Sequence, residues 1–258
     1  MPIDLAQGTH PSTILRWCQI GEDMEHGHSV QEIRKRLTEK NAPSDLRDFV
    51  YGSIDGTITT FAIVAGVEGA NLSPSIIIAL GFANVLADGF SMAASNYSGT
   101  KAELDDMKRL RQVELRHLQT NPDGEREEIR QILILKGLEG EVLEGAVEAI
   151  TSQQERWIDM MMVEEYGVLP QNPNPIRAAL ITFFAFVICG MIPLLSYMLG
   201  LGDAFLAAAI GTGVTFFFIG ALKSRWSLQH WMWSGLETLG IGGIAAAVAY
   251  FVGTLFAT

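Results

Sequence analysis

Five long apolar stretches, separated by polar segments, set the pattern of this chain. They cover residues 49–70, 74–96, 177–200, 204–222 and 235–257, and each is rich in Ala, Gly, Leu, Ile or Phe with almost no charge. A helix of about 20 such residues is long enough to cross a bilayer. The pattern therefore predicts an all-α, polytopic membrane protein with five transmembrane helices, whose two ends lie on opposite sides of the membrane.

The segment between the second and third stretches is different. Residues 99–169 contain no apolar run of spanning length, and they hold more than half of the 29 acidic residues. Helical spacing and turn residues predict helices over about 101–120, 125–138 and 141–166, the first continuing the second span. We expect these helices to form a three-helix bundle.

The chain then divides into four parts. The first 46 residues include a short amphipathic helix from Ser29 to Glu39, for which Ser29 is a suitable cap; the first span and the second follow in 47–98. The acidic bundle occupies 99–170, and the remaining spans occupy 171–258.

Charge placement predicts the orientation. All 18 Lys and Arg residues lie before the first span, between the second and third, or between the fourth and fifth. By the positive-inside rule, the N-terminus and the bundle are cytoplasmic and the C-terminus is outside. The net charge of −11 argues against nucleic acid or an anionic membrane surface as a partner of the protein as a whole. The short loops and the absence of a signal-peptide pattern favour a bacterial inner membrane over an organelle membrane.

Asp55 is the first candidate functional residue, because it lies inside the first apolar stretch. A carboxylate there costs about 2.5–3.5 kcal/mol on insertion scales, so we expect it to face a bundle interior, a water-filled path or a bound cation. Thr59 lies one turn away, near the same face. The alternative is a buried aspartate with satisfied hydrogen bonds, beside a packing stripe of small residues formed by Gly52, Gly56 and Thr60.

Polar residues recur in the second apolar stretch. Asn84, Asp88 and Met92 are spaced four residues apart and so lie along one stripe of a helix. An amide, a carboxylate and a thioether together suit a transition metal better than Na⁺ or Ca²⁺, because sulfur is a soft ligand.

The acidic segment contains three groups of metal-ligand residues at helical spacing. Each group projects from one helix face; the groups are Glu114 with His117, Glu125 with Glu128, and Met161 or Met162 with Glu165. We favour a metal-binding cluster over a solvated acidic face, since gathered like charges need a cation to offset their repulsion. Glu-x-x-His occurs once, whereas di-iron oxidases need it twice, so an enzyme is not expected.

Several segments together resemble one known family. They are DFVYGSIDGTITTFAIVAG, ANVLADGFSMAASNY, MMMVEEYGV, FFFIGALKSRWS and GLETLGIGGIAAAVAYFVG, and they fall within residues 48–253. With these segments, the chain resembles the vacuolar iron transporter family.

The resemblance implies a homodimer in which the first span of each copy lines a central path. The implied activity is export of Fe²⁺, with Mn²⁺, Co²⁺ and Zn²⁺ as further candidates, from the cytosol in exchange for protons. The metal is then a substrate, and no permanent cofactor is expected. The alternative is a non-transporting, membrane-anchored protein that binds and buffers iron.

The resemblance also implies the ligands. The membrane site maps onto Asp55 and Met92. The bundle site maps onto Glu114, Glu125, Glu128, Met161, Met162 and Glu165. His117 stands where the family usually has glutamate, and Asn84 where it can have an acid; imidazole in place of carboxylate suits Zn²⁺, Co²⁺ or Fe²⁺ more than Mn²⁺. The roles of Glu237 and of His10, His26 and His28 stay open.

Overall fold

The computed structural model describes residues 28–38, 45–168 and 173–257, and the chain divides into two compact units, residues 1–41 and 42–258. The first unit contains helix α2 (Val30–Thr38). Its start is the predicted capping box, because Ser29 Oγ accepts from the Glu32 N–H at 3.3 Å and the Ser29 N–H donates to the Glu32 carboxylate at 3.2 Å. His10 and His26 lie outside the described residues.

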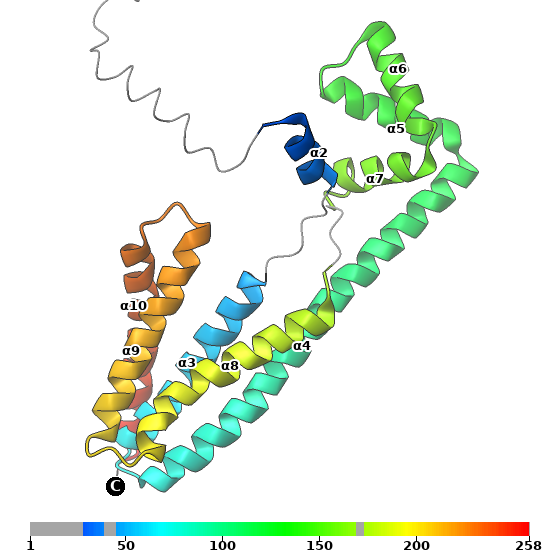
Figure 1. The fold of residues 1–258 in the computed structure, drawn as a ribbon. Helices are drawn as coiled ribbons and strands as arrows, with labels where there is room; N and C mark the ends of the chain where they lie inside the picture. The colour runs from blue at the N-terminus through cyan, green and yellow to red at the C-terminus, as the bar shows by residue number, and fades with distance from the viewer. Residues whose placement is uncertain (1–27, 39–44, 169–172, 258) are drawn as a thin grey trace, which may run out of the picture. The chain divides into compact units, whose positions relative to one another are not determined.

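Among its described residues, the second unit contains five helices long and apolar enough to cross a membrane, as the sequence predicts (Figure 1). They are α3 (Leu46–Gly69), α4 (Pro74–Thr120), α8 (Pro175–Met198), α9 (Ala204–Lys223) and α10 (Trp231–Thr254). The described part of the chain contains no strand, so the all-α class is confirmed. A short 3₁₀ turn, η1 (Ser224–Trp226), follows α9.

Helix α3 packs against all four other spans, and most closely against α8. A side chain at Gly52 would meet the backbone of Thr182, and one at Gly56 would meet the backbone of Phe186. Lipid is as apolar as a leucine side chain, so close approach at small residues, rather than burial from water, holds such helices together. The small residues of span one therefore fix its position, and with it the position of Asp55.

Helix α4 is a single helix of 47 residues that crosses the membrane region and runs on to the acidic segment, as predicted. There it packs against α5 (Pro122–Leu135) and α7 (Gln154–Glu164), and α6 (Gly140–Thr151) packs against both of these helices. We call these three helices and the end of α4 from residue 101 the helical bundle. Its apolar core includes Ile129, Leu133, Leu143, Val147 and Met161.

The bundle differs from the prediction in one respect: the single helix expected over 141–166 is two helices. The break lies at Ser152 and Gln153, where Gln153 has extended backbone angles of φ −129° and ψ 111°. Ile150, Thr151 and Ser152 are weak helix formers, and the Ser152 hydroxyl donates to the Ala149 carbonyl at 2.9 Å, which competes with the helical ladder.

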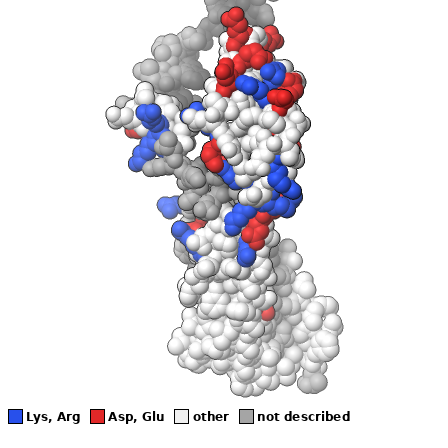
Figure 2. All heavy atoms as spheres, turned by 90° about the vertical axis from the view of Figure 1, so that its right-hand side faces the viewer, with Lys and Arg blue, Asp and Glu red and all other residues white. Residues whose placement is uncertain are grey.

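Charged side chains gather away from the spans. Figure 2 shows Lys, Arg, Asp and Glu concentrated over the upper part of the molecule and an almost uncharged lower part. Because two spans precede the bundle and four precede the α9–α10 connection, these two segments lie on the same side of the five spans.

Candidate metal centre and membrane path

The bundle brings Glu114, His117 and Glu125 together. Glu114 and His117 lie three residues apart near the end of α4, and Glu125 lies in the first turn of α5. Asn121 makes the turn between the helices, since its side-chain oxygen accepts from the Gly124 N–H at 3.3 Å. This tight reversal returns α5 against α4, so two of the predicted residue pairs share one site.

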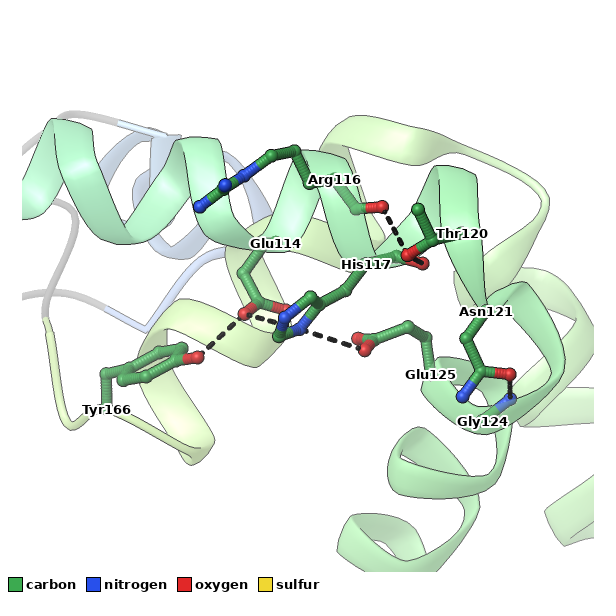
Figure 3. A network of polar contacts seen from close by, with 8 residues as sticks. All are labelled: Glu114, Arg116, His117, Thr120, Asn121, Gly124, Glu125 and Tyr166. Carbon is green, nitrogen blue, oxygen red and sulfur yellow. Dashed lines mark hydrogen bonds and ion pairs between the residues drawn. The ribbon is translucent and has the colours of Figure 1, made fainter.

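The three side chains point toward one another (Figure 3). Each offers a ligand atom, and these atoms all lie within 4.8 Å of one another. His117 Nδ1 is 3.3 Å from Glu125 Oε1 and 3.8 Å from Glu114 Oε1. Two carboxylates and an imidazole are a donor set that divalent first-row transition metals accept.

Burial makes this cluster costly without a cation. Glu114 is 1% exposed and Glu125 is 4% exposed. The Oε2 atom of each is buried and has no hydrogen-bond partner in the described structure. An unpaired buried carboxylate oxygen loses its hydration without compensation. A bound divalent cation would satisfy both oxygens at once, so the residues fit a metal.

The protonation of Glu125 reflects the same crowding. Burial, followed by the negative charges of Glu128 and Glu114, raises the pKa of Glu125 to about 7. The pKa of Glu165 is also raised, first by burial and then by the charges of Glu114 and Glu128. Glu128 and Glu165 are therefore close enough to act electrostatically on the cluster.

Tyr166 also contacts this cluster, although no pattern in the sequence singles it out. Its hydroxyl donates to Glu114 Oε1 at 2.8 Å. Burial and this hydrogen bond raise the pKa of Tyr166, so the phenol remains a donor at neutral pH. The contact fixes the side chain of Glu114 and ties the end of α7 to α4. A tyrosine beside Glu165 was the available signal, but nothing in the spacing says which way it points.

The two methionines are buried, at the end of α7. Met161 packs in the apolar core of the bundle with Ile129 and Leu133. Met162, the next residue, is 7% exposed.

In the membrane region, Asp55 and Thr59 lie half-buried on one face of α3. The Thr59 hydroxyl donates its proton to the Asp55 backbone carbonyl at 2.9 Å. The lone pairs of the Thr59 oxygen therefore remain available as acceptors. Asp88 on α4 is the charged neighbour of Asp55. The Asn84 amide group donates to Asp88, while Asn84 Oδ1 is buried without a hydrogen-bond partner. The predicted polar stripe of α4 therefore faces the predicted acid of α3.

Met92 lies one turn beyond Asp88 and lines a groove of about 320 Å³, together with Arg47, Asn96 and Glu103. Next to it is a network that the sequence did not indicate. Asn96 Nδ2 donates to Asp48 Oδ1 at 3.0 Å and to Thr182 Oγ1 at 2.7 Å. This network joins α3, α4 and α8 at the end of the spans from which α4 runs to the bundle.

The chain is similar to a known protein family. A sequence profile of the VIT family matches residues 46–254. A protein of Centaurea cyanus named vacuolar iron transporter is 34% identical over 233 residues, which are 88% of this chain and 94% of that protein. Vacuolar iron transporter 1 of Arabidopsis thaliana is 35% identical over 227 residues, 85% of this chain and 90% of that one. A vacuolar iron transporter of Plasmodium berghei is 32% identical over 225 residues, 83% and 82% of the two chains.

Proposed function

Since this chain belongs to the VIT family, we propose that it moves divalent transition metal ions, Fe²⁺ first among them, out of the cytosol across the membrane. The names of its relatives support iron as cargo. The observation on which the proposal depends is the pair of buried, unpaired carboxylate oxygens of Glu114 and Glu125. They belong to a cluster in which one ligand atom from each of Glu114, His117 and Glu125 lies within 4.8 Å of the others. Such a site stabilises the protein only when a cation fills it.

The helical bundle collects the ion. Glu114, His117 and Glu125 form the inner ligand set, and Glu128 and Glu165 supply negative charge around it. We propose Met161 and Met162 as further ligands, reached by a rotation of these flexible thioethers. A mixed set of oxygen, nitrogen and sulfur admits Mn²⁺, Co²⁺ and Zn²⁺ as well as Fe²⁺.

The ion then passes along α3 and α4. Asp55, Asp88 and the free Asn84 oxygen offer oxygen ligands inside the span, while Thr59 and Met92 complete the path. Ionisable groups in a span cost energy, which supports a transport role for them. Span one is proposed to line this path in a homodimer, because the face bearing Asp55 is only half covered within one copy.

Proton antiport is the proposed coupling. Metal and proton compete for the same carboxylates, because a carboxylate binds metal in its deprotonated form. A proton that arrives from outside therefore releases the ion, and the ion that arrives from the bundle displaces the proton.

The proposed orientation places the N-terminus and the bundle in the cytosol and the C-terminus outside, from the Lys and Arg distribution. The short connections between spans support a bacterial inner membrane. The relatives are named for vacuoles, and in either membrane the same orientation removes metal from the cytosol.

Uptake by proteoliposomes tests the proposal. The vesicles enclose a metal-sensitive dye, carry an imposed pH gradient, and receive Fe²⁺, Mn²⁺, Co²⁺ and Zn²⁺ in separate trials. We expect gradient-dependent uptake by the wild type and none by Asp55→Asn. Glu237→Gln is the matched control, an exposed span acid 3.7 Å from Lys223, and it should transport normally. Undiminished uptake by Asp55→Asn would refute the proposed path.

The membrane-anchored buffer remains the second candidate, favoured by the same buried cluster. It predicts that the wild type binds metal in detergent but takes up none into vesicles. The binding would then be lost in Glu114→Gln with Glu125→Gln, and Asp55→Asn would leave it unchanged.

A further inference from the structure

A groove of about 620 Å³ lies at the connection between α9 and α10, far along the chain from the metal cluster. One wall is apolar and includes Phe218, Leu222 and Trp231. The other is polar and includes Arg225, Gln229 and His230. None of the described residues that line the groove is acidic. Its two walls match an amphiphile that has a polar head and an apolar tail.

The polar wall consists of hydrogen-bond donors. No described acidic side chain forms an ion pair with Arg225, whereas nearby Lys223 lies 3.7 Å from the carboxylate of Glu237. His230 Nδ1 accepts from the Met232 N–H at 3.4 Å, which assigns the proton of the neutral ring to Nε2. The amide of Gln229 adds further N–H groups. This wall therefore offers positive charge and donors, a combination that binds phosphate.

The apolar wall faces outward. Phe218 is 66% exposed in the described structure, and Trp231 is 50% exposed. Trp226, Leu228 and Trp233, which lie close to the lining residues along the chain, are also exposed. Tryptophan is enriched at the height of lipid headgroups, where its ring meets both apolar and polar surroundings. Exposed tryptophans beside a polar wall therefore suit the level at which a lipid headgroup meets its acyl chains.

Two arguments decide the charge of the occupant. The groove lies on the same side of the spans as the bundle, which the proposed orientation makes cytoplasmic, and the cytoplasmic leaflet is the anionic one. In addition, a protein of net charge −11 repels anions elsewhere. Arg225 forms no ion pair with a described acidic side chain, so the groove is a selective site for anions.

We propose that this groove binds a phospholipid with an anionic headgroup. The headgroup phosphate pairs with the Arg225 guanidinium, with Gln229 and His230 donating to its remaining oxygens. An acyl chain lies along Phe218 and Trp231. The site is independent of the metal cluster, and it seats the α9–α10 connection on the membrane surface.

Native mass spectrometry of the full-length protein in detergent tests this. The probes are dioleoyl phosphatidylglycerol, dioleoyl phosphatidylcholine and inorganic phosphate, each titrated separately. We expect the wild type to bind phosphatidylglycerol more tightly than phosphatidylcholine, and Arg225→Gln to lose about five-fold of the phosphatidylglycerol affinity. Arg225→Lys keeps the charge but not the forked donors of the guanidinium, so its affinity for phosphatidylglycerol should lie between those of the wild type and Arg225→Gln.

Arg177→Gln is the matched control. Arg177 begins a span on the same side but pairs with Asp45, so its loss should not change lipid binding. Equal binding of the two lipids by the wild type, or an equal loss in Arg177→Gln and Arg225→Gln, would overturn the proposal. So would Arg225-dependent binding of inorganic phosphate without any preference between the lipids, which would make the ligand a free anion. Unchanged elution in gel filtration shows that the variants remain folded.

Discussion

The Tyr166 hydroxyl donates to Glu114 Oε1 at 2.8 Å. Removing this one hydroxyl tests whether the hydrogen bond positions Glu114 for metal binding. Tyr166→Phe removes only the hydroxyl. Loss of a hydrogen bond that orients a metal ligand costs about ten-fold or more in affinity. In an Asp55→Asn background, which isolates the bundle site, calorimetry with Co²⁺ should therefore show binding at least about ten-fold weaker.

Tyr97→Phe is the control for that experiment, because Tyr97 lies on α4 outside the cluster. It should leave Co²⁺ affinity unchanged. If both tyrosine variants bind Co²⁺ as tightly as their parent, Tyr166 does not position Glu114.

Glu125 predicts a pH dependence of stability in the metal-free protein. Its native pKa of about 7 exceeds the ordinary value of 4.5, so the native state holds a proton that the unfolded chain releases between these values. Stability from this group thus falls as pH rises through that window, and the loss is complete above it. In chelator, Glu125→Gln should be more stable than wild type by about 1–3 kcal/mol at pH 8 and similar to it at pH 4.5.

Glu127→Gln provides the contrast on the same helix. Hydrogen bonds from Gln131 and Arg130 lower the pKa of the exposed Glu127, so this substitution should not stabilise the protein at high pH. Thermal unfolding of the wild type, Glu125→Gln and Glu127→Gln across the pH range measures the stability difference of each variant from the wild type. A constant difference between wild type and Glu125→Gln at every pH would contradict the assignment.

The ligands of the cluster could be proposed from spacing, but their arrangement could not. The pairing of Glu114 with His117 follows from a helical repeat, and a turn at Asn121 was expected. Burial of both glutamates, and the phenol of Tyr166 beside them, depend on how α7 returns to α4. Asn96 was missed for the same reason, because its partners Asp48 and Thr182 are on other helices.

At the scale of helices, the contact between α3 and α8 depends on Gly56. A methyl group there would meet the Phe186 backbone, which cannot rotate away. Gly56→Ala should therefore destabilise the protein by about 1–3 kcal/mol, although alanine favours the helix. Thermal unfolding in detergent measures the change.

Gly211→Ala is the control within the membrane region. Its added Cβ would lie 3.5 Å from Ile192 Cγ2, an ordinary contact. Stability should be unchanged or slightly higher, since alanine has a higher helix propensity than glycine. If Gly56→Ala is as stable as Gly211→Ala, the two spans do not approach each other as closely as described.

The spans were predicted well because their signal is strong and local. Each needs only a long apolar run, and the structure moves their ends by a few residues; α3, for example, begins at Leu46 rather than 49. The break between α6 and α7 was missed because it depends on a weak preference over Ile150–Ser152. Such preferences are decided by tertiary packing, here by the return of α7 against α4 and α5.

For the whole molecule, the half-buried face of span one that bears Asp55 is the main argument for a dimer. Asp55, Thr59, Ala62 and Gly66 lie at helical spacing and are half-buried, although α3 is surrounded by four helices. Ala62 and Gly66 also line a groove of about 390 Å³ between α3 and α10. A second copy that packs here would enclose the acid of the proposed path between two spans, away from lipid.

Cysteine cross-linking tests that arrangement. In a Cys18→Ser, Cys189→Ser background, Ala62→Cys should form a disulfide-linked dimer in oxidised membranes, because two copies related by a two-fold axis bring the same residue face to face. Ile188→Cys, on an exposed face of α8, should remain monomeric. If only Ile188→Cys forms cross-links, the dimer interface lies at α8, and Asp55 faces lipid in each copy. A path lined by span one would then have no second wall, and the transport proposal would need the ion to cross within a single copy.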